Sequence, residues 1–109
     1  MTRPWPVALT GLGCICALGD GLEACMDGLI RGKRAPAPPV RFTSSHPAPY
    51  PVFEIADFQG DPALLRTSSL ALHAAREALA DARLGAGEWA SLRVGVCVGT
   101  TVGSTLSDE

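Results

Sequence analysis

The residues of this sequence that could do chemistry are first of all its thiols and imidazoles. The chain has four cysteines and two histidines: Cys14, Cys16, Cys25, Cys97, His46 and His73. Cys14 and Cys16 form a CxC pair, no second pair follows at a spacing typical of a zinc site, and neither histidine completes a ligand pattern. Free cysteine in an apolar run behaves as a small hydrophobic residue. We therefore predict reduced, structural thiols and no metal site.

Cys97 is the thiol whose neighbours most resemble a catalytic motif. Gly95 and Gly99 stand two residues before and two residues after it, which is the spacing of a nucleophile elbow. The adjacent Val96 and Val98 are β-branched, and such residues favour a strand over a sharp, strained turn. A thiol buried in a strand has a raised pKa and little reactivity. The sequence therefore favours a structural role for Cys97.

Gly11 and Gly13 are candidates for a phosphate-binding loop. They form a GxG between an apolar run and a helix-like segment, as in dinucleotide-binding folds. The third glycine of GxGxxG would fall at position 16, which is Cys16. The segment RGKRAPAPP also stands where such a fold needs a second strand that ends in an acidic residue. A small nucleotide-binding domain stays an alternative.

The elements that would position these residues alternate between strand and helix. The apolar run 6–12 and the β-branched run 93–98 predict two buried strands. Residues 36–51 hold six of the nine prolines and predict an irregular surface loop, followed by a short edge strand at 52–55. With two helices between the strands, this order predicts an α/β fold around central buried strands.

The first helix is predicted over residues 21–31. Apolar side chains recur there at helical spacing and form one stripe. Asp20 is a plausible N-cap, and Gly32 is a plausible residue after the C-cap, where glycine adopts the left-handed conformation most easily.

The second helix is predicted to begin at Asp61-Pro62, an N-cap followed by proline at the first helical position. It should run to Leu84 and end at Gly85. Small side chains let a backbone pack nearby, so its alanines suggest close approach to a sheet. These are Ala71, Ala75, Ala78 and Ala82.

Composition limits the size and the partners of the domain. The 109 residues are enough for one small domain. Hydrophobic residues make up 47% and charged residues 18%, which is little charge for the surface of a free-standing small domain. We therefore expect more chain or a partner to cover part of this surface. The formal net charge of −2 argues against a nucleic-acid or membrane-surface footprint.

The apolar residues 7–18 behind Arg3 have the outline of an export signal. Gly11 and Gly13 interrupt them, however, and no small-residue cleavage site follows. No stretch approaches the roughly 20 apolar residues that are needed to span a bilayer. We predict a cytoplasmic protein that contacts neither nucleic acid nor membrane.

Three ordered segments resemble the β-ketoacyl-acyl-carrier-protein synthases, the condensing enzymes of fatty acid and polyketide assembly. They are VALTGLGCICALGDGLEACMDGLIRGK, DPALLRTSSLALHAAREALADARL and RVGVCVGTTVGS. They match the family's first strand, turn and helix, its second helix, and its R-x-G strand with a Gly/Ser/Thr-rich turn. By this resemblance, residues 1–109 are the N-terminal portion of a β-ketoacyl synthase domain. The implied fold is α/β of the thiolase type, a mixed sheet with packed helices that is incomplete in this chain.

The resemblance implies decarboxylative Claisen condensation in the full enzyme. The nucleophilic cysteine and two histidines of the family would lie beyond this chain, so none of its residues is expected to be catalytic and the chain alone should be inactive. No cofactor is implied. The implied partners are an acyl carrier protein and a second subunit, in a homodimer or a ketosynthase-type heterodimer. A non-catalytic subunit or interaction module, like the chain-length factors, stays an alternative.

The resemblance also implies roles for a few residues of this chain. Thr101 and Val102 stand where relatives line the acyl-chain tunnel, so we expect them in the wall of the substrate pocket. Thr101 and Ser104 replace glycines that relatives commonly carry, which indicates a specialised branch. Since the strands lack neighbours, the isolated chain should fold poorly. Structural roles in turns are expected for four glycines: Gly11, Gly13, Gly19 and Gly99.

Overall fold

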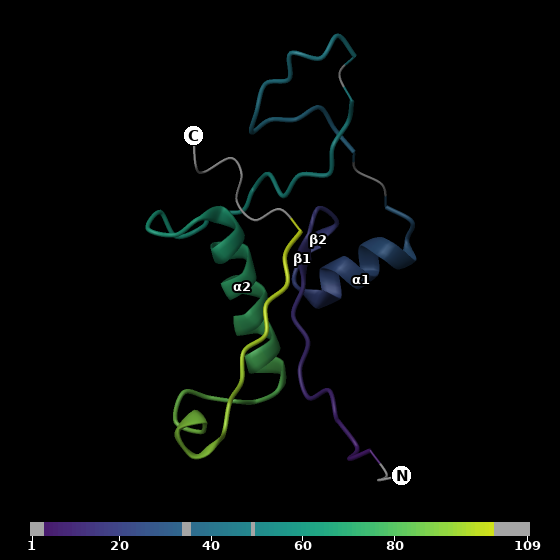
Figure 1. Ribbon diagram of the computed structural model, residues 1–109. Coiled ribbons are helices and arrows are strands. Elements are labelled where there is room, and N and C mark those ends of the chain that lie inside the picture. Colours follow the sequence, from purple (N-terminus) through teal and green to yellow (C-terminus); the bar gives the residue numbers. More distant parts are fainter. Residues whose placement is uncertain (1–3, 34–35, 49, 102–109) are drawn as a thin grey trace.

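The structure is a computed structural model that describes residues 4–33, 36–48 and 50–101. Within these ranges it contains two short strands, two α-helices and one 3₁₀ turn (Figure 1). Helices and a small sheet are compatible with a partial α/β domain. The elements are β1 (Ile15–Cys16), β2 (Gly19–Asp20), α1 (Leu22–Ile30), α2 (Arg66–Asp81) and η1 (Trp89–Ser91).

The sheet is a small antiparallel hairpin that leads directly into α1. Ile15 pairs with Asp20 and Cys16 with Gly19, so two residues form the turn between the strands. The Gly21 amide donates to the Cys14 carbonyl at 3.0 Å and extends the pairing by one step. The hairpin thereby folds the chain back and places the start of α1 beside residue 14.

Helix α1 confirms the first predicted helix to within a residue at each end. The prediction for its C-terminus is confirmed in detail, because Gly32 has φ 63° and Lys33 N donates to Gly28 O at 2.9 Å. The prediction for its N-terminus is wrong. The N-cap is Gly21, with φ 93° and no side-chain cap, and the Asp20 carboxylate instead contacts a histidine of α2.

Helix α2 is shorter at its start than predicted. Asp61 does not cap it, because its Oδ1 accepts from the Ala63 amide at 2.9 Å within a separate turn. The chain is extended at Leu65, with φ −60° and ψ 145°, and the helix begins at Arg66. Asp61-Pro62 therefore starts a turn that precedes the helix.

The end of α2 also differs from the prediction. The helix stops at Asp81, and Arg83 takes the left-handed conformation with φ 58°. Leu84 N then donates to Leu79 O at 2.9 Å, which closes the same type of C-terminal motif that glycine usually forms. Gly85 therefore does not stop the helix, since an arginine has already done so two residues earlier.

The three strands predicted outside the hairpin do not form among the described residues. Residues 6–12 and 93–98 are extended but form no strand. The two segments run in the same direction in Figure 1. Residues 52–55 contribute only a single bridge, in which Val52 pairs with Ala37. A strand needs hydrogen bonds to a neighbour about 4.8 Å away, and the described residues form no such ladder there. The loop 36–51 is irregular apart from this bridge, as predicted.

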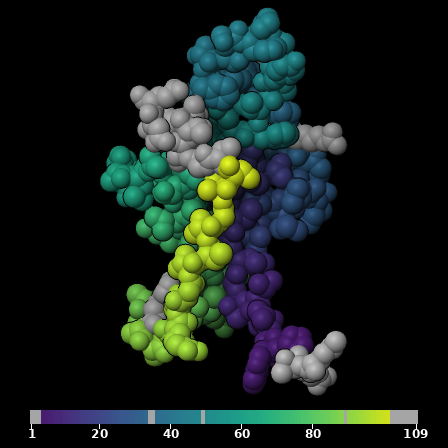
Figure 2. Space-filling model, in the orientation of Figure 1, coloured from purple at the N-terminus to yellow at the C-terminus, as the bar shows by residue number. Residues whose placement is uncertain are grey.

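The described residues enclose very little core. Cys25 is the buried hydrophobic residue and Ser69 the buried polar one, at 3% and 6% exposure. The Cα radius of gyration is 17.6 Å, against about 13 Å for a compact domain of this length. Figure 2 shows residues 93–100 lying along the outside of the molecule. An apolar surface of this extent is normally covered by more chain or by a partner.

Candidate functional site

The extended residues 11–13 lie directly against the alanine face of α2. A Cβ atom on Gly11 would come within 2.0 Å of the Ala78 carbonyl oxygen, and one on Gly13 within 1.9 Å of the Ala74 carbonyl oxygen. Real Cβ atoms never approach an oxygen so closely, so only glycine fits at either position. The alanine-rich face therefore does bring α2 close to another backbone, but that backbone is a single extended segment.

Two carboxylates of α2 accept the backbone amides of this segment. Asp81 Oδ2 accepts from Leu12 N at 2.9 Å, and Glu77 Oε2 accepts from Cys14 N at 2.8 Å. Since Glu77 and Asp81 are four residues apart on a helix, they share one face with the alanines. Side-chain acceptors thereby satisfy amides that would otherwise need a neighbouring strand.

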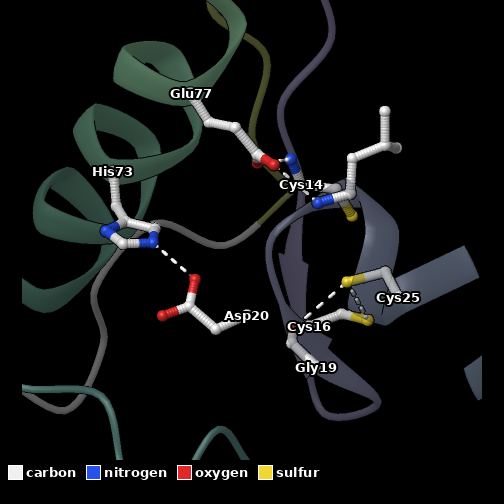
Figure 3. A network of polar contacts seen from close by, with 8 residues as sticks. Cys14, Cys16, Gly19, Asp20, Cys25, His73 and Glu77 are labelled. Atoms are coloured by element: carbon white, nitrogen blue, oxygen red, sulfur yellow. Dashed lines mark hydrogen bonds and ion pairs between the residues drawn. The ribbon is translucent and has the colours of Figure 1, made fainter. Parts of the chain in front are cut away.

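Glu77 also serves as the missing cap of α1. Its second oxygen, Oε1, accepts from Leu22 N at 2.7 Å, which is the first amide of the helix (Figure 3). A carboxylate at a helix N-terminus satisfies an orphan donor and favours the helix dipole. One side chain therefore joins α2, the residue before β1 and the start of α1. The sequence analysis missed this role because the two partners are 55 residues apart.

A third polar contact joins the end of β2 to α2. His73 Nε2 lies 2.5 Å from Asp20 Oδ1, and the two side chains point toward one another in Figure 3. The His73 ring also meets Phe58 edge to face, with ring centroids 5.4 Å apart. Both members of the Asp20–His73 pair are more than one-third exposed, so the pair contributes modestly to stability.

The other histidine, His46, lies in the proline-rich loop beside Tyr50.

Arg66 fastens the segment before α2 to the first turn of that helix. Its guanidinium donates to the backbone carbonyls of Phe58, at 3.1 Å, and Ile55. It also stacks over the Phe58 ring at 5.4 Å from the centroid. Burial lowers the pKa of Arg66, and the nearby charge of Arg41 lowers it further. The side chain is therefore a structural clamp for residues 55–58.

Three of the four thiols gather beside the hairpin, which the sequence analysis did not anticipate. The Sγ atoms of Cys14, Cys16 and Cys25 all lie within 4.8 Å of one another. Cys16 Sγ and Cys25 Sγ are 3.4 Å apart, and Cys25 Sγ donates to the Gly19 carbonyl at 3.1 Å. The cluster could have been predicted from the sequence if residues 17–18 had been recognised as a hairpin turn. Such a turn brings Cys16 back toward Cys25, which lies on the apolar stripe of the next helix.

The thiols of this cluster differ in acidity. A hydrogen bond from the Leu18 backbone lowers the pKa of Cys16. Burial, together with the hydrogen bond with Cys16, raises the pKa of Cys25 to about 12. Cys97 lies apart from the cluster and is exposed. The prediction of a buried strand thiol at Cys97 is therefore wrong within the described residues, because no strand forms there.

The expected site residues differ in how closely their surroundings constrain them. Gly19 is constrained, because a Cβ there would lie 2.6 Å from Ala24 Cβ, whereas a Cβ on Gly99 would meet nothing within 4 Å. Thr101 is exposed at a bend, and its expected role in a pocket wall stays a prediction. Val102 and Ser104 lie outside the described residues.

Comparison with known proteins establishes the class to which this arrangement belongs. The family model of the β-ketoacyl synthase N-terminal domain matches residues 5–109. The chain therefore belongs to the β-ketoacyl synthase family and corresponds to its N-terminal domain. No solved structure matches the chain significantly. Among the described residues, no helix is long and apolar enough to cross a bilayer.

Two curated relatives agree with this assignment. The chain is 31% identical over 113 residues to 3-oxoacyl-[acyl-carrier-protein] synthase 2 of Synechocystis sp., covering 94% of this chain and 27% of the relative. It is 33% identical over 107 residues to the protein of the same name from Coxiella burnetii, covering 89% of this chain and 25% of the relative. The chain thus spans about a quarter of the length of the curated relatives it matches.

Proposed function

We propose that these residues are the N-terminal part of a 3-oxoacyl-[acyl-carrier-protein] synthase-type condensing enzyme. The observation that supports this most is the family match over residues 5–109, together with two relatives named as such synthases. In the proposed reaction, a cysteine thiolate takes an acyl group from its carrier thioester and releases the carrier thiol. Malonyl-carrier then loses CO₂, and its carbanion attacks the acyl-cysteine thioester. The product is a 3-oxoacyl-carrier, and the cysteine thiolate is regenerated.

The contribution of this chain to that reaction is a scaffold. Glu77 and Asp81 fix residues 12–14 on α2, and Gly11 and Gly13 allow the backbones to touch. None of the chain's own cysteines and histidines is assigned to the chemistry. Thr101 and Val102 are proposed for the wall of the acyl pocket, on the basis of the family resemblance alone.

The partners proposed for the whole protein follow from the same family. An acyl carrier protein would deliver the acyl and malonyl groups, and a second subunit would complete a homodimer or a ketosynthase-type heterodimer. The exposed apolar side chains of residues 93–98 are consistent with a surface that a neighbour covers, since Val96 is 85% and Val98 75% exposed. We propose a cytoplasmic location and a condensation reaction that uses no cofactor.

A non-catalytic subunit that completes its sheet with another chain is the second candidate, and the same exposed surface favours it. The nucleotide-binding alternative has less support. Its GxG glycines would have to approach a pyrophosphate at a helix N-terminus. Gly11 and Gly13 instead lie against the α2 backbone, which fills the space beside them.

The test is an activity assay on the protein in the form in which it occurs in cells. The tagged protein, purified from its native host, is given acyl-carrier and malonyl-carrier, and the release of CO₂ and 3-oxoacyl-carrier is measured. We expect both products from the native form and neither from the 109-residue chain alone. A native form that co-purifies with a synthase subunit but has no reactive cysteine of its own would support the non-catalytic candidate and contradict the proposal.

A further inference from the structure

The cluster of Cys14, Cys16 and Cys25 has no part in the proposed reaction. The three thiols are free, and their sulfurs converge between the hairpin and the first turn of α1 (Figure 3). Cys14 and Cys16 share one face of the extended chain, because side chains alternate along a strand. Cys25 comes from the helix that the hairpin turns back toward them. Three elements of local structure therefore bring three soft ligand atoms together.

The spacing of the sulfurs suits a single metal ion. A metal–sulfur bond of about 2.3 Å places three sulfurs in a trigonal plane about 4 Å apart. In the cluster the Cys16–Cys25 separation is 3.4 Å, and all three sulfurs lie within 4.8 Å of one another. The required separation falls within this range, so we expect rotations of the cysteine side chains to form the site.

We infer that Cys14, Cys16 and Cys25 bind one Cu(I) ion through three thiolates. Thiolates select soft ions such as Cu(I) and zinc, and structural zinc takes four protein ligands. Within the described part of the chain the cluster consists of thiols alone, which suits an ion that accepts three ligands. Binding forms three copper–sulfur bonds and releases three thiol protons to water. Copper keeps its oxidation state, and the site carries a net charge of −2.

A cleft beside the hairpin gives an ion a route to the cluster. The thiols lie near the N-terminal end of α1, where the Glu77 carboxylate accepts the Leu22 amide at 2.7 Å. The Lys33 ammonium donates to the Leu18 carbonyl at 3.3 Å. Cys16, Leu18 and Lys33 also line a cleft of about 290 Å³. An ion that enters this cleft can therefore reach the Cys16 thiol.

The experiment uses the protein purified from its native host without oxygen, reduced and stripped of metal. Cu(I) is added in competition with a Cu(I)-selective chelator, and X-ray absorption at the copper edge counts the sulfur neighbours. We expect one ion per chain with three sulfurs at about 2.3 Å. Cys14→Ser and Cys16→Ser should each weaken binding by at least about a hundredfold. Cys97→Ser, the matched control, should leave binding unchanged.

Several results would overturn the site. A count of two sulfur neighbours around copper would reduce the site to the CxC pair. A loss of copper binding in Cys97→Ser equal to that in the other variants would show that the thiols capture copper non-specifically. Formation of a Cys16–Cys25 disulfide, with no copper retained, would make the cluster a redox pair. Binding of zinc but not Cu(I) would contradict the ion proposed. The buried Cys25 is left intact in both variants, and the sulfur count on the unaltered protein does not depend on any variant folding well.

Discussion

Residues 11–14 and residues 93–98 are both extended, rich in apolar or small side chains, and form no strand among the described residues. The first segment is nevertheless fixed, because α2 supplies two carboxylate acceptors and a face of alanines that admits its glycines. In the second segment Val94, Val96 and Val98 are all more than half exposed. The difference shows that an apolar, strand-like sequence needs a local partner before it acquires a fixed position.

The largest difference is expected between the thiol of Cys25, which α1 places beside the first segment, and the thiol of Cys97 in the second segment. Burial raises the pKa of Cys25 to about 12, so at pH 8 its thiolate fraction is about a thousandfold smaller than that of an unfolded cysteine. In the metal-free protein, alkylation of Cys25 at pH 8 should be slower by about that factor than in urea. It should accelerate as the pH rises toward 12, because the thiolate is the reacting form. The exposed Cys97 should react without unfolding.

The measurement is mass spectrometry of peptides after timed exposure to iodoacetamide. Equal alkylation of Cys25 and Cys97 at pH 8 in the folded protein would mean that the hairpin and α1 do not shield Cys25, and the comparison between the regions would fail.

The next largest effect is expected at the contact between the fixed segment and α2. Gly13→Val places side-chain atoms where the Ala74 carbonyl oxygen lies, 1.9 Å from the Cβ position. The segment must then move off the helix, which should lower the free energy of unfolding by more than about 3 kcal/mol. Thermal unfolding followed by circular dichroism gives the change.

Gly99→Val is the matched control for that substitution, because a Cβ at Gly99 meets nothing within 4 Å. It should change stability by less than about 0.5 kcal/mol. Similar losses in both variants would indicate that the two glycines act through the unfolded chain and not through contact with α2.

Removal of the Glu77 carboxylate should have a slightly smaller effect. Glu77→Ala leaves the Cys14 and Leu22 amides without their acceptor, and hydrogen bonds to charged groups contribute about 1.5–3 kcal/mol each. We expect a loss of about 3 kcal/mol in chemical denaturation, and a smaller loss for Glu77→Gln, which keeps one acceptor oxygen. Arg76→Ala, at an exposed position one residue earlier, should be nearly neutral. A neutral Glu77→Ala would contradict the role of this side chain.

The smallest effect should be a gain at the end of α2. Arg83 holds φ 58°, a conformation that costs a residue with a Cβ about 1 kcal/mol. Arg83→Gly should therefore raise the free energy of unfolding by about that amount, while Arg83→Ala should give no gain. If both variants behave alike in thermal unfolding, the left-handed conformation at this position is not maintained in solution.

These effects also indicate what the sequence could predict. The bounds of α1 and the role of Gly32 depend on neighbours within one element, and they were predicted correctly. The alanines of α2 were expected against a sheet and instead lie against a single extended segment. The cap of α1 was not predicted, because Glu77 reaches Leu22 from a distant helix. The thiol cluster was not predicted either, because it depends on the hairpin register that brings Cys16 back toward Cys25. Gly85 was expected to end α2, but Arg83 already adopts the left-handed conformation that ends the helix two residues earlier.

The buried strands at 6–12 and 93–98 were predicted from their apolar character, but the side chains of Val7, Leu9 and Val96 are 92%, 86% and 85% exposed. Apolar character indicates that such a surface is normally covered. It does not say which chain covers the surface. Since the described residues contain no pairing partner for either segment, the pattern is present without the strand. Neither the predicted burial nor the predicted strands are therefore found at these segments within the described residues.

The most direct test of the difference between the two regions is hydrogen exchange of single amides in the protein purified from its native host, followed by NMR. The amides of Leu12, Cys14 and Leu22 donate to Asp81 and Glu77, so they should exchange at least about tenfold more slowly than those of Val96 and Val98. Glu77→Ala should remove the protection of Cys14 and Leu22 and leave that of Leu12 in place. Uniform, rapid exchange at all five positions would contradict the claim that α2 fixes the first segment.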